Sequence, residues 1–348
     1  GFEVLDCYLI NNENDIAVDI SLLGVDYLAG GGYRHLVPKD WDRGASKRKD
    51  NRNLLLEMET IGYRIFVTEE DTDTFLQYIP KKNDKVAAFF GPSHLSHEID
   101  RQTMGLSEPS LAQMTKKGIE VLSYNPKGFF YVVEGGRIDY SGHNQDAVTT
   151  IYDMLAFNDA VYEAIQFYNE HPDETLIVVT GDHETGGLTL GCAHTEKKNN
   201  FEHFFNQTIS YERFNSDILK PFKRAHTPET AHINDLKTEI EKFFGIDFYG
   251  LSPMEMEMIT KGFQASMLGD ELNREDELIH IIYGLNDPLL ISITNITSQR
   301  AGVCWTSFDH TANPVATYAL GVGARLFNGY YESADICKKS TAVMTGKK

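Results

Sequence analysis

The sequence predicts an α/β fold, a mostly parallel β-sheet with helices on both faces, interrupted by one insertion. From residue 14 to about residue 190, segments with helical periodicity alternate with short apolar segments typical of strands. Several of the apolar segments are hydrophobic along their whole length, as are parallel strands that helices cover on both faces. From about residue 191 to residue 297 the alternation stops, and a polar, partly helical sequence follows.

The first 123 residues contain three expected helices and three expected strands. Each helix places apolar residues three or four positions apart, and each strand is a short apolar run. The expected helices are Asp15–Leu23, Asn53–Thr60 and Ser110–Ser123, and the expected strands are Val25–Leu28, Tyr63–Val67 and Val86–Phe90. Gly30-Gly31-Gly32 follows the first strand, and no Gly-Lys-Ser/Thr comes after it, so it is interpreted as a tight turn and not as a phosphate-binding P-loop.

The second half of the alternating region contains the clearest helix in the chain. This helix spans about Asp146 to Tyr168, with Asp146 as a plausible N-cap. Its apolar residues, Ala147, Ile151, Met154, Leu155, Val161, Tyr162, Ile165 and Tyr168, share one face. We expect that face to pack on the sheet. Expected strands are Phe129–Val133, Thr175–Thr180 and, after the insertion, Pro314–Leu320.

These patterns predict two regions. An α/β core that carries the functional residues spans 1–190 and 298–348, and an insertion or cap-like segment spans 191–297. Helices are expected within the insertion at Met254–Leu268 and Asn273–Ile282. The insertion is expected to lie over or beside the mouth of the site.

Composition narrows the classes of partner. The 348 residues include 32 basic and 51 acidic side chains, a net charge of −19, which argues against nucleic acid as a partner. The same charge disfavours an anionic substrate unless bound cations reverse the local field. The chain has no run of about 20 apolar residues, so no segment is expected to span a bilayer. The four cysteines, Cys7, Cys192, Cys304 and Cys337, form no CxxC pair and by themselves indicate neither compartment nor metal.

Acidic and imidazole side chains lie at the ends of three apolar strands. Ligands of open α/β sheets bind just beyond the carboxyl ends of the strands. Burying several such groups together is costly unless a cation or hydrogen bonds compensate them. The candidate ligands, from three separate segments, are Glu134, Asp139, His143, Asp182, His183 and His310.

These residue types together favour a metal centre. Carboxylate oxygen with imidazole nitrogen suits zinc, and oxygen-rich positions suit magnesium. Two divalent ions about 4 Å apart would stabilise the attacking and leaving oxygens of a phosphoryl transfer. A single acid near a strand end is more often a helix cap, so the prediction rests on the joint occurrence of the clusters. The remaining histidines considered are expected in solvated loops or on the surface: His94, His97, His194, His203, His226 and His232.

At these residues the chain resembles the alkaline phosphatases, from about Asn14 to Met344 apart from the insertion. The stretches that carry the resemblance are Glu134-Gly-Gly-Arg-Ile-Asp139 with His143, Thr180-Gly-Asp-His-Glu-Thr-Gly-Gly187 and Asp309-His-Thr311. Further matching stretches are Asp26–Gly32, Asn51–Leu55, Pro126–Phe130 and Tyr318–Gly321.

The resemblance implies a role for each candidate ligand. Asp139, His143 and His310 would bind a first zinc, Asp182 and His183 a second zinc, and Glu134 a magnesium. Tyr140 and Ala312 stand where the family often has other residues. The resemblance also implies hydrolysis of phosphate monoesters through a phosphoserine, by an exported (periplasmic or secreted) homodimer.

The resemblance assigns no catalytic residue to this chain. The family's nucleophilic serine, a bridging aspartate and a magnesium-binding threonine belong upstream of Gly1. Its phosphate-binding arginine belongs at about Leu9–Asn12, yet the first basic residue is Arg34. A truncated chain, a separate amino-terminal chain and a degenerate homologue are the three explanations, and a gap or unpaired edge in the sheet is expected. The alternative functions are an inactive metal-binding fragment and a phosphodiesterase of the same superfamily.

Overall fold

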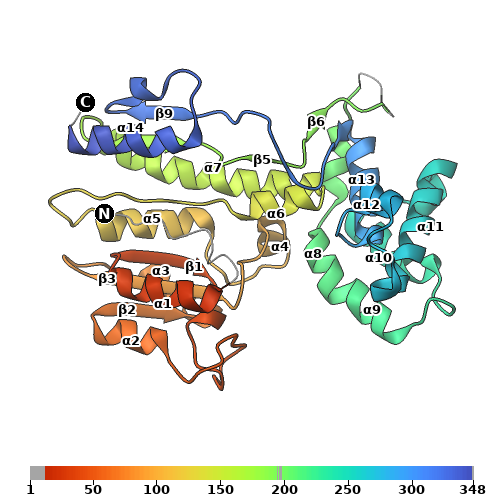
Figure 1. Cartoon of the computed structure of the whole chain (residues 1–348), viewed down its shortest axis with the longest axis horizontal. Helices are drawn as coiled ribbons and strands as arrows, with labels where there is room; N and C mark the ends of the chain where they lie inside the picture. The colour runs from red at the N-terminus through yellow and green to blue at the C-terminus, as the bar shows by residue number, and fades with distance from the viewer. Residues whose placement is uncertain (1–11, 194, 196–197, 347–348) are drawn as a thin grey trace. The chain divides into compact units, whose positions relative to one another are not determined.

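The computed structural model describes residues 12–193, 195 and 198–346 (Figure 1). These residues form two compact units. The first unit comprises the described parts of Gly1–Ser96 together with Leu106–Glu134 and Ala156–His171. The second comprises His97–Gly105, Gly135–Leu155 and the described parts of Pro172–Lys348. Helices and strands together confirm the α/β class, whereas the division into a core and an insertion at residues 191–297 stays a prediction.

The first unit is built on a three-stranded parallel sheet in the order β1-β3-β2 (red and orange in Figure 1). The strands are β1 (Tyr27–Gly31), β2 (Tyr63–Val67) and β3 (Lys85–Gly91). In the central strand, Val86, Ala88 and Phe90 belong to one hydrophobic cluster, and Ala87 and Phe89 belong to another. This alternation shows that both faces of the sheet are covered, as the apolar runs predicted.

The first unit contains the helices α1 (Glu13–Leu23), α2 (Leu54–Thr60), α3 (Thr72–Gln77) and α5 (Leu111–Leu122). Side chains at the starts of α2 and α5 satisfy backbone N–H groups that have no partner within the helix. Asn53 accepts a 3.1 Å hydrogen bond from the N–H of Leu56, and Ser110 forms a capping box with Gln113. Three of the four were expected, and α3, a single short turn, was not.

The strand expected at Phe129–Val133 is wrong. The stretch is extended but pairs with no strand in the part of the chain that the structure describes, and Phe130 and Val132 are exposed. Tyr131 contacts the ring of Tyr27 in β1 with centroids 5.8 Å apart. A strand requires a ladder of backbone hydrogen bonds to a neighbour, and side-chain packing alone does not provide one.

Helix α7 (Ala147–Glu170) forms where periodicity predicted it, but its apolar face is not covered as expected. Asp146 caps it by accepting a 3.1 Å hydrogen bond from the N–H of Thr149. Four residues of the predicted face are exposed: Ile151, Met154, Leu155 and Tyr162. Periodicity identifies side chains that share a face, but it does not identify what covers that face.

The strands of the second unit form short antiparallel pairs. β4 (Leu176–Val179) pairs with β9 (Tyr318–Gly321), β5 (Glu184–Thr185) with β8 (His310–Thr311), and β6 (Thr189–Leu190) with β7 (Val303–Cys304). β9 begins four residues later than the expected Pro314. The unit also contains α4 (Glu98–Thr103), α6 (Arg137–His143) and the last helix, α14 (Ser333–Thr345).

Between β6 and β7 lies a helical segment with its own hydrophobic core. Its helices are α8 (Tyr211–Phe214), α9 (Lys220–Ala225), α10 (Lys237–Phe244), α11 (Pro253–Leu268), α12 (Glu277–Tyr283) and α13 (Pro288–Arg300). The fully buried side chains of this core include Phe214, Ile240, Ile259, Leu289 and Ile293. The helix expected at Met254–Leu268 is confirmed. The one expected at Asn273–Ile282 begins later, because Asp276 caps the N–H groups of Leu278 and Ile279.

Two buried carboxylates tie this helical segment to α4 and α7. Asp100 accepts hydrogen bonds from the backbone N–H (2.8 Å) and hydroxyl (2.6 Å) of Ser210. Asp146 accepts one from the N–H of Tyr211 (3.0 Å) and another from Gln207 Nε2 (2.9 Å). Burial raises the pKa of both carboxyl groups, and these hydrogen bonds oppose the rise. The path of the chain at residues 207–211 is thereby set by side chains of α4 and α7.

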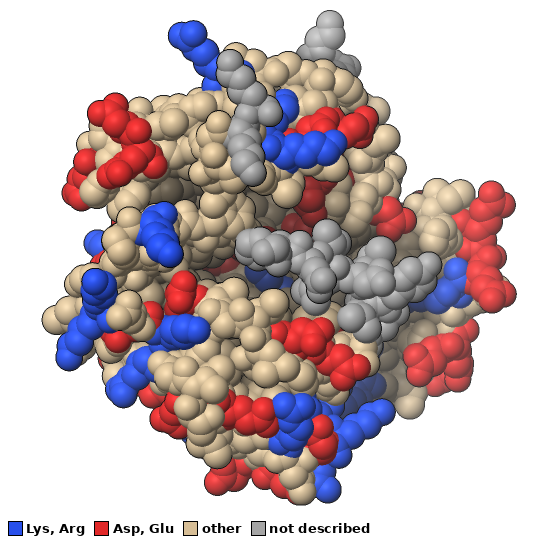
Figure 2. Space-filling model, turned by 60° about the vertical axis from the view of Figure 1, so that its left-hand side comes forward, with Lys and Arg blue, Asp and Glu red and all other residues tan. Residues whose placement is uncertain are grey.

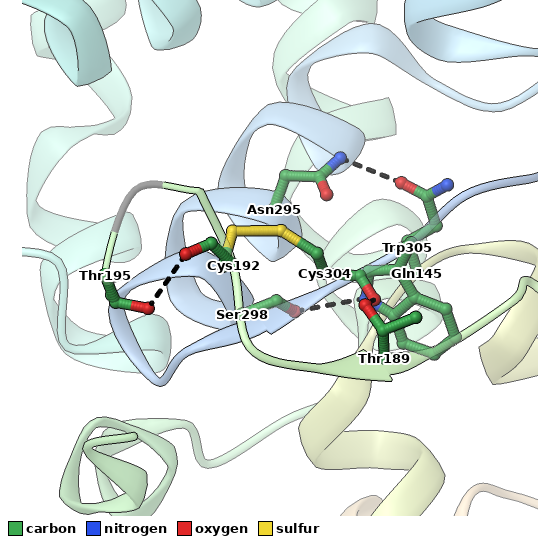
Figure 3. Close-up of a disulfide and its surroundings, with 8 residues drawn as sticks. All are labelled: Gln145, Thr189, Cys192, Thr195, Asn295, Ser298, Cys304 and Trp305. Carbon is green, nitrogen blue, oxygen red and sulfur yellow. Dashed lines mark hydrogen bonds between the residues drawn. A yellow bond between two sulfur atoms is a disulfide. The ribbon is translucent and has the colours of Figure 1, made fainter. Parts of the chain in front are cut away.

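A disulfide between Cys192 and Cys304 joins the two ends of the same helical segment, across 112 residues (Figure 3). Near it, Asn295 donates to Gln145 Oε1 (2.9 Å) and Trp305 Nε1 donates to Ser298 Oγ (3.3 Å). The scattered cysteines of the sequence did not reveal this pairing. No helix in the described part of the chain is both long and apolar enough to cross a bilayer.

We predict that Cys192→Ser lowers the stability of the second unit by about 2–4 kcal/mol, because the disulfide closes a long loop and limits the unfolded chain. The measurement is the urea midpoint without reductant. Cys337, which is exposed and unpaired, provides the matched control Cys337→Ser, and its midpoint should stay unchanged. Equal midpoints for Cys192→Ser and the parent would show that the disulfide does not stabilise the fold.

A second prediction concerns the ion pair of the buried Glu255 in α11 and the partly buried Arg300 in α13, 2.6 Å apart. Burial acts to raise the pKa of Glu255, but hydrogen bonds from Arg300 and Ser252 outweigh it and lower the pKa to about 2. Since the folded pKa lies below the unfolded value of about 4.5, the carboxylate contributes stability above that pH and loses it as the pH falls towards 2.

Glu255→Gln should therefore destabilise the protein by about 3 kcal/mol at pH 7 and remove part of the acid dependence between pH 4.5 and 2. Denaturation curves across this pH range are the measurement. Glu257→Gln, on the same helix, breaks an exposed pair with Lys261 and should leave both quantities unchanged. A parallel loss in the two variants would refute the role of burial.

Candidate metal centre

Helix α6 positions the first two candidate ligands. Asp139 and His143 are four residues apart, so their side chains lie on one face of the helix, one above the other. His143 Nε2 lies 3.3 Å from Asp139 Oδ1. Both side chains are about one-third exposed, at 35% for Asp139 and 30% for His143, so an ion can reach them from solvent.

The pairing of β5 with β8 brings the third ligand to this helix. In the antiparallel register, His310 lies opposite Thr185, and His310 Nε2 comes within 3.5 Å of Asp139 Oδ1. One ligand atom from each of Asp139, His143 and His310 lies within 4.8 Å of the others. The structure therefore brings together three of the six residues expected from the sequence, although His310 is 167 positions from His143.

His183 and Asp182 lie beside this group. The ring of His183 stacks on the ring of His310, with centroids 3.4 Å apart and planes at 19°. Asp182 Oδ2 lies 3.2 Å from His183 Nε2, and the Asp182 side chain is 88% exposed. Asp182 and His183 thus add a carboxylate and an imidazole beside the group formed by Asp139, His143 and His310.

Two expected features are not placed with these residues. Glu134 belongs to the first compact unit, so its role as a magnesium ligand stays a prediction. Leu9–Asn12, where the resemblance places an arginine, lies outside the described residues except for Asn12.

Thr185 orients two of the candidate ligands, and the sequence reasoning missed it. Its hydroxyl donates a 2.5 Å hydrogen bond to Asp139 Oδ1 and lies 3.2 Å from His183 Nδ1. Because the hydroxyl proton is used for Asp139, the contact with His183 requires an N–H on Nδ1, and in the neutral imidazole Nε2 then carries the lone pair. Thr185 is two residues after His183, and this spacing in an extended stretch was the available signal.

A backbone carbonyl orients His143 in the same way. His143 Nδ1 donates to the carbonyl oxygen of Phe308, so the lone pair of the neutral imidazole is on Nε2, on the side of Asp139. The backbone carbonyl of His143 accepts a 2.9 Å hydrogen bond from Asn286 Nδ2. Both imidazoles therefore present the tautomer that a metal ion needs.

The two glycines after Thr185 allow this close approach. Gly186 and Gly187 have φ of +86° and +61°, which side chains rarely adopt. A Cβ on Gly186 would lie 2.6 Å from the Trp305 ring, and a Cβ on Gly187 would lie 1.8 Å from Thr306 Oγ1. The Gly-Gly pair thus lets strand β5, which directly follows His183, lie against the segment that leads to His310.

A buried ion network holds the amino-terminal end of α6. His97, expected in a solvated loop, is instead fully buried, with Nδ1 2.6 Å from Asp153 Oδ2 and Nε2 3.4 Å from Glu212 Oε2. Glu212 also accepts a hydrogen bond from Arg137, the first residue of α6. Burial acts to lower the pKa of His97, but the bonds to the two carboxylates raise it overall. Sequence spacing missed this role because Asp153 and Glu212 are distant in the chain.

The donor set fits divalent cations. Oxygen and nitrogen ligands from Asp and His are typical of zinc, and the hydrogen bonds of Thr185 and Phe308 are the supporting contacts that metal-ligating groups usually have. The arrangement can hold cations at a partly exposed surface. Chemically, such a site can stabilise negative charge on oxygen.

Comparisons with known proteins point to one family. The family model described as "Alkaline phosphatase" matches residues 8–345. Alkaline phosphatase 3 of Bacillus subtilis is 26% identical over 314 residues, which cover 90% of this chain and 57% of that protein. The chain spans about half the length of the curated relatives it matches.

Solved structures show the same likeness. The cold-active alkaline phosphatase of a psychrophilic Shewanella species aligns with a TM-score of 0.69 and 25% identity, over 97% of this chain and 69% of that one. A variant of the alkaline phosphatase of the Antarctic bacterium TAB5, with Mg bound in its M3 site, aligns with a TM-score of 0.55 and 20% identity, over 96% and 65% of the two chains.

We predict that Thr185→Val weakens zinc binding by about 10- to 100-fold, because the variant keeps the shape of the side chain but loses the hydroxyl that orients Asp139 and His183. Titration calorimetry with zinc measures the effect. Thr189→Val, on the neighbouring exposed strand β6, is the matched control and should bind zinc as the parent does. Unchanged affinity in Thr185→Val would show that this hydroxyl does not support the ligands.

Proposed function

Because this chain belongs to the alkaline phosphatase family, we propose that the protein hydrolyses phosphate monoesters at a site built around Asp139. The observation that carries the proposal is the convergence of Asp139, His143 and His310 from two segments far apart in the sequence. Ligand atoms of this kind, within 4.8 Å of one another, can bind a cation that stabilises phosphoryl-transfer chemistry.

We assign each candidate ligand to an ion. Asp139, His143 and His310 would hold a first zinc, Asp182 and His183 a second zinc, and Glu134 a magnesium. The stacking of His183 on His310 supports neighbouring zinc positions. The magnesium bound to the TAB5 relative supports a magnesium-binding position in this family.

Bound zinc ions would supply electrostatic stabilisation for the attacking and leaving oxygens of the ester. The chain's own residues prepare the ligands for this role. Thr185 and the Phe308 carbonyl hold the imidazoles of His183 and His143 with Nε2 as the lone-pair donor. The network from His97 through Glu212 to Arg137 holds the helix that carries Asp139 and His143.

The net charge of −19 is consistent with a phosphate-ester substrate only if cations occupy the site. On the face of the molecule in Figure 2, acidic and basic side chains are interspersed. The proposed substrates are small phosphate monoesters, cleaved through a phosphoserine intermediate, and a nucleic-acid partner is not proposed.

We also propose an exported, homodimeric protein of the periplasm or the exterior. The Cys192–Cys304 disulfide supports export, because such bonds persist in oxidising compartments and are rare in the cytosol.

A second candidate function for this chain alone is metal binding without turnover. It is favoured by the cluster of Asp139, His143 and His310, which can bind a cation whether or not a nucleophile is present. A phosphodiesterase is the third candidate, and the matching motifs disfavour it.

The test is hydrolysis of 4-nitrophenyl phosphate by the protein loaded with zinc and magnesium, with zinc content measured in parallel. We expect His310→Ala to lose one zinc and to lower kcat/KM by at least about 100-fold, because the first zinc loses a ligand. His203→Ala, a histidine of the helical segment, is the matched control and should change neither value.

Three outcomes separate the candidates. Stoichiometric zinc binding without hydrolysis would favour the inactive metal-binding chain. Faster hydrolysis of bis(4-nitrophenyl) phosphate than of the monoester would favour the phosphodiesterase. An unchanged zinc content in His310→Ala would refute the assignment of the first zinc.

A further inference from the structure

The helical segment contains a pocket of about 460 Å³ that shares no residue with the candidate metal ligands. This volume falls in the range of sites that bind small organic molecules. Its walls come from the end of α4, from residues 208–209, from the helix that begins at Tyr211 and from α10. The lining residues are Thr103, Met104, Thr208, Ile209, Arg213, Asp217, Ile218, Thr238, Glu239, Lys242 and Phe243.

Two hydrogen bonds to backbone carbonyl groups hold the walls of this pocket together. Thr103 Oγ1 donates to the carbonyl of Thr208 (2.7 Å), and the N–H of Thr208 donates to the carbonyl of Phe243 (2.9 Å). Thr208 therefore connects the end of α4 to the end of α10 through one hydrogen bond to each helix. The cavity is a preformed feature of the second unit, which lowers the ordering cost of binding a ligand.

A π-helical turn at Asn215–Leu219 supplies one side of the pocket. Such turns are rare and occur frequently at functional sites. This turn places Asp217 and Ile218 in the lining, and Asp217 Oδ2 lies 2.8 Å from Arg213 Nε. Arg213 and Asp217 therefore neutralise each other within the wall.

Two charged groups of the lining have no oppositely charged partner among the described residues. Glu239 Oε2 is shielded from solvent and has no hydrogen-bond partner in this part of the chain. Lys242 forms no ion pair within the described residues, and its ammonium lies 4.6 Å from the centroid of the Phe243 ring. By contrast, Lys237 and Glu241 of the same helix pair with each other at 3.6 Å.

These two groups have opposite signs and lie one helical turn apart. A shielded carboxylate oxygen without a partner is costly and calls for a hydrogen-bond donor, which an ammonium group supplies. Lys242 at the exposed rim calls for an anion. The other walls of the pocket, formed by Met104, Ile209, Ile218 and Phe243, are apolar.

We propose that this pocket binds a small zwitterion with an apolar body, of the class of aliphatic α-amino acids. The ammonium group of the ligand bonds to Glu239, its carboxylate pairs with Lys242, and its side chain lies against the apolar wall. The lining has no net charge, since Arg213 and Lys242 balance Asp217 and Glu239, and a zwitterion preserves that balance. This inference does not depend on the proposed phosphatase activity.

Titration calorimetry of L-leucine into the full chain tests the proposal. We expect saturable binding with a dissociation constant of about 10 µM to 1 mM. Isoamylamine lacks the carboxylate and 4-methylpentanoate lacks the amine, so each should bind at least about 10-fold more weakly. Absence of saturable binding of leucine up to about 10 mM would overturn the proposal.

Variants locate the binding site. Glu239→Gln and Lys242→Met should each weaken leucine binding at least about 10-fold. Glu271→Gln and Lys220→Met make the same chemical changes at exposed positions outside the lining and should bind normally. Thr238→Phe, at an exposed lining position, should fill the cavity and abolish binding while leaving the thermal midpoint unchanged.

Two results would count against the assignment. Normal affinity in both Glu239→Gln and Lys242→Met would show that leucine binds elsewhere. Isoamylamine that binds as tightly as leucine would show that the carboxylate is not recognised, and the zwitterion class would then be wrong.

Discussion

The candidate metal centre depends on one short antiparallel pairing, between β5 and β8. It aligns Thr185 with His310 and so brings a histidine from late in the chain to the carboxylate of Asp139 on α6. Only two residues of each strand take part, so the backbone hydrogen bonds of the pair alone contribute little stability. The site therefore relies on supports around this pairing.

Those supports act at different levels. The glycines after Thr185 permit close contact with Trp305 and Thr306, and the Glu184 carboxylate accepts hydrogen bonds from Gly187 and from the hydroxyl of Thr311 in β8. In the chain, the helical segment lies between β5 and β8. The disulfide joins its two ends, and the buried Asp100 and Asp146 bind the backbone near its start. Packing, the disulfide and hydrogen bonds thus all favour the register that aligns Thr185 with His310.

Electrostatics links this site to its proposed chemistry. Several acidic groups stand in a chain that is already strongly negative, and a cation is the simplest group to compensate them. The buried network of His97, Asp153, Glu212 and Arg137 shows the other solution, in which protein cations pair with the carboxylates. The ligands on α6 present free lone pairs instead, which suits them to bind an ion from solution.

The sequence by itself determined the α/β class, the helices α1, α2, α5 and α7 and the strands of the parallel sheet, because hydrophobic periodicity is a local property. It also predicted six candidate ligands from their residue chemistry, and the structure brings Asp139, His143 and His310 together. The sequence failed at Phe129–Val133, at the exposed face of α7 and at His97, because each depends on what lies alongside. Only the tertiary structure decided that Thr185 orients Asp139, that Cys192 pairs with Cys304, and that Glu239 and Lys242 line one pocket. Contacts between residues far apart in the chain are set by the packing of whole elements, and no pattern within one segment of sequence contains that information.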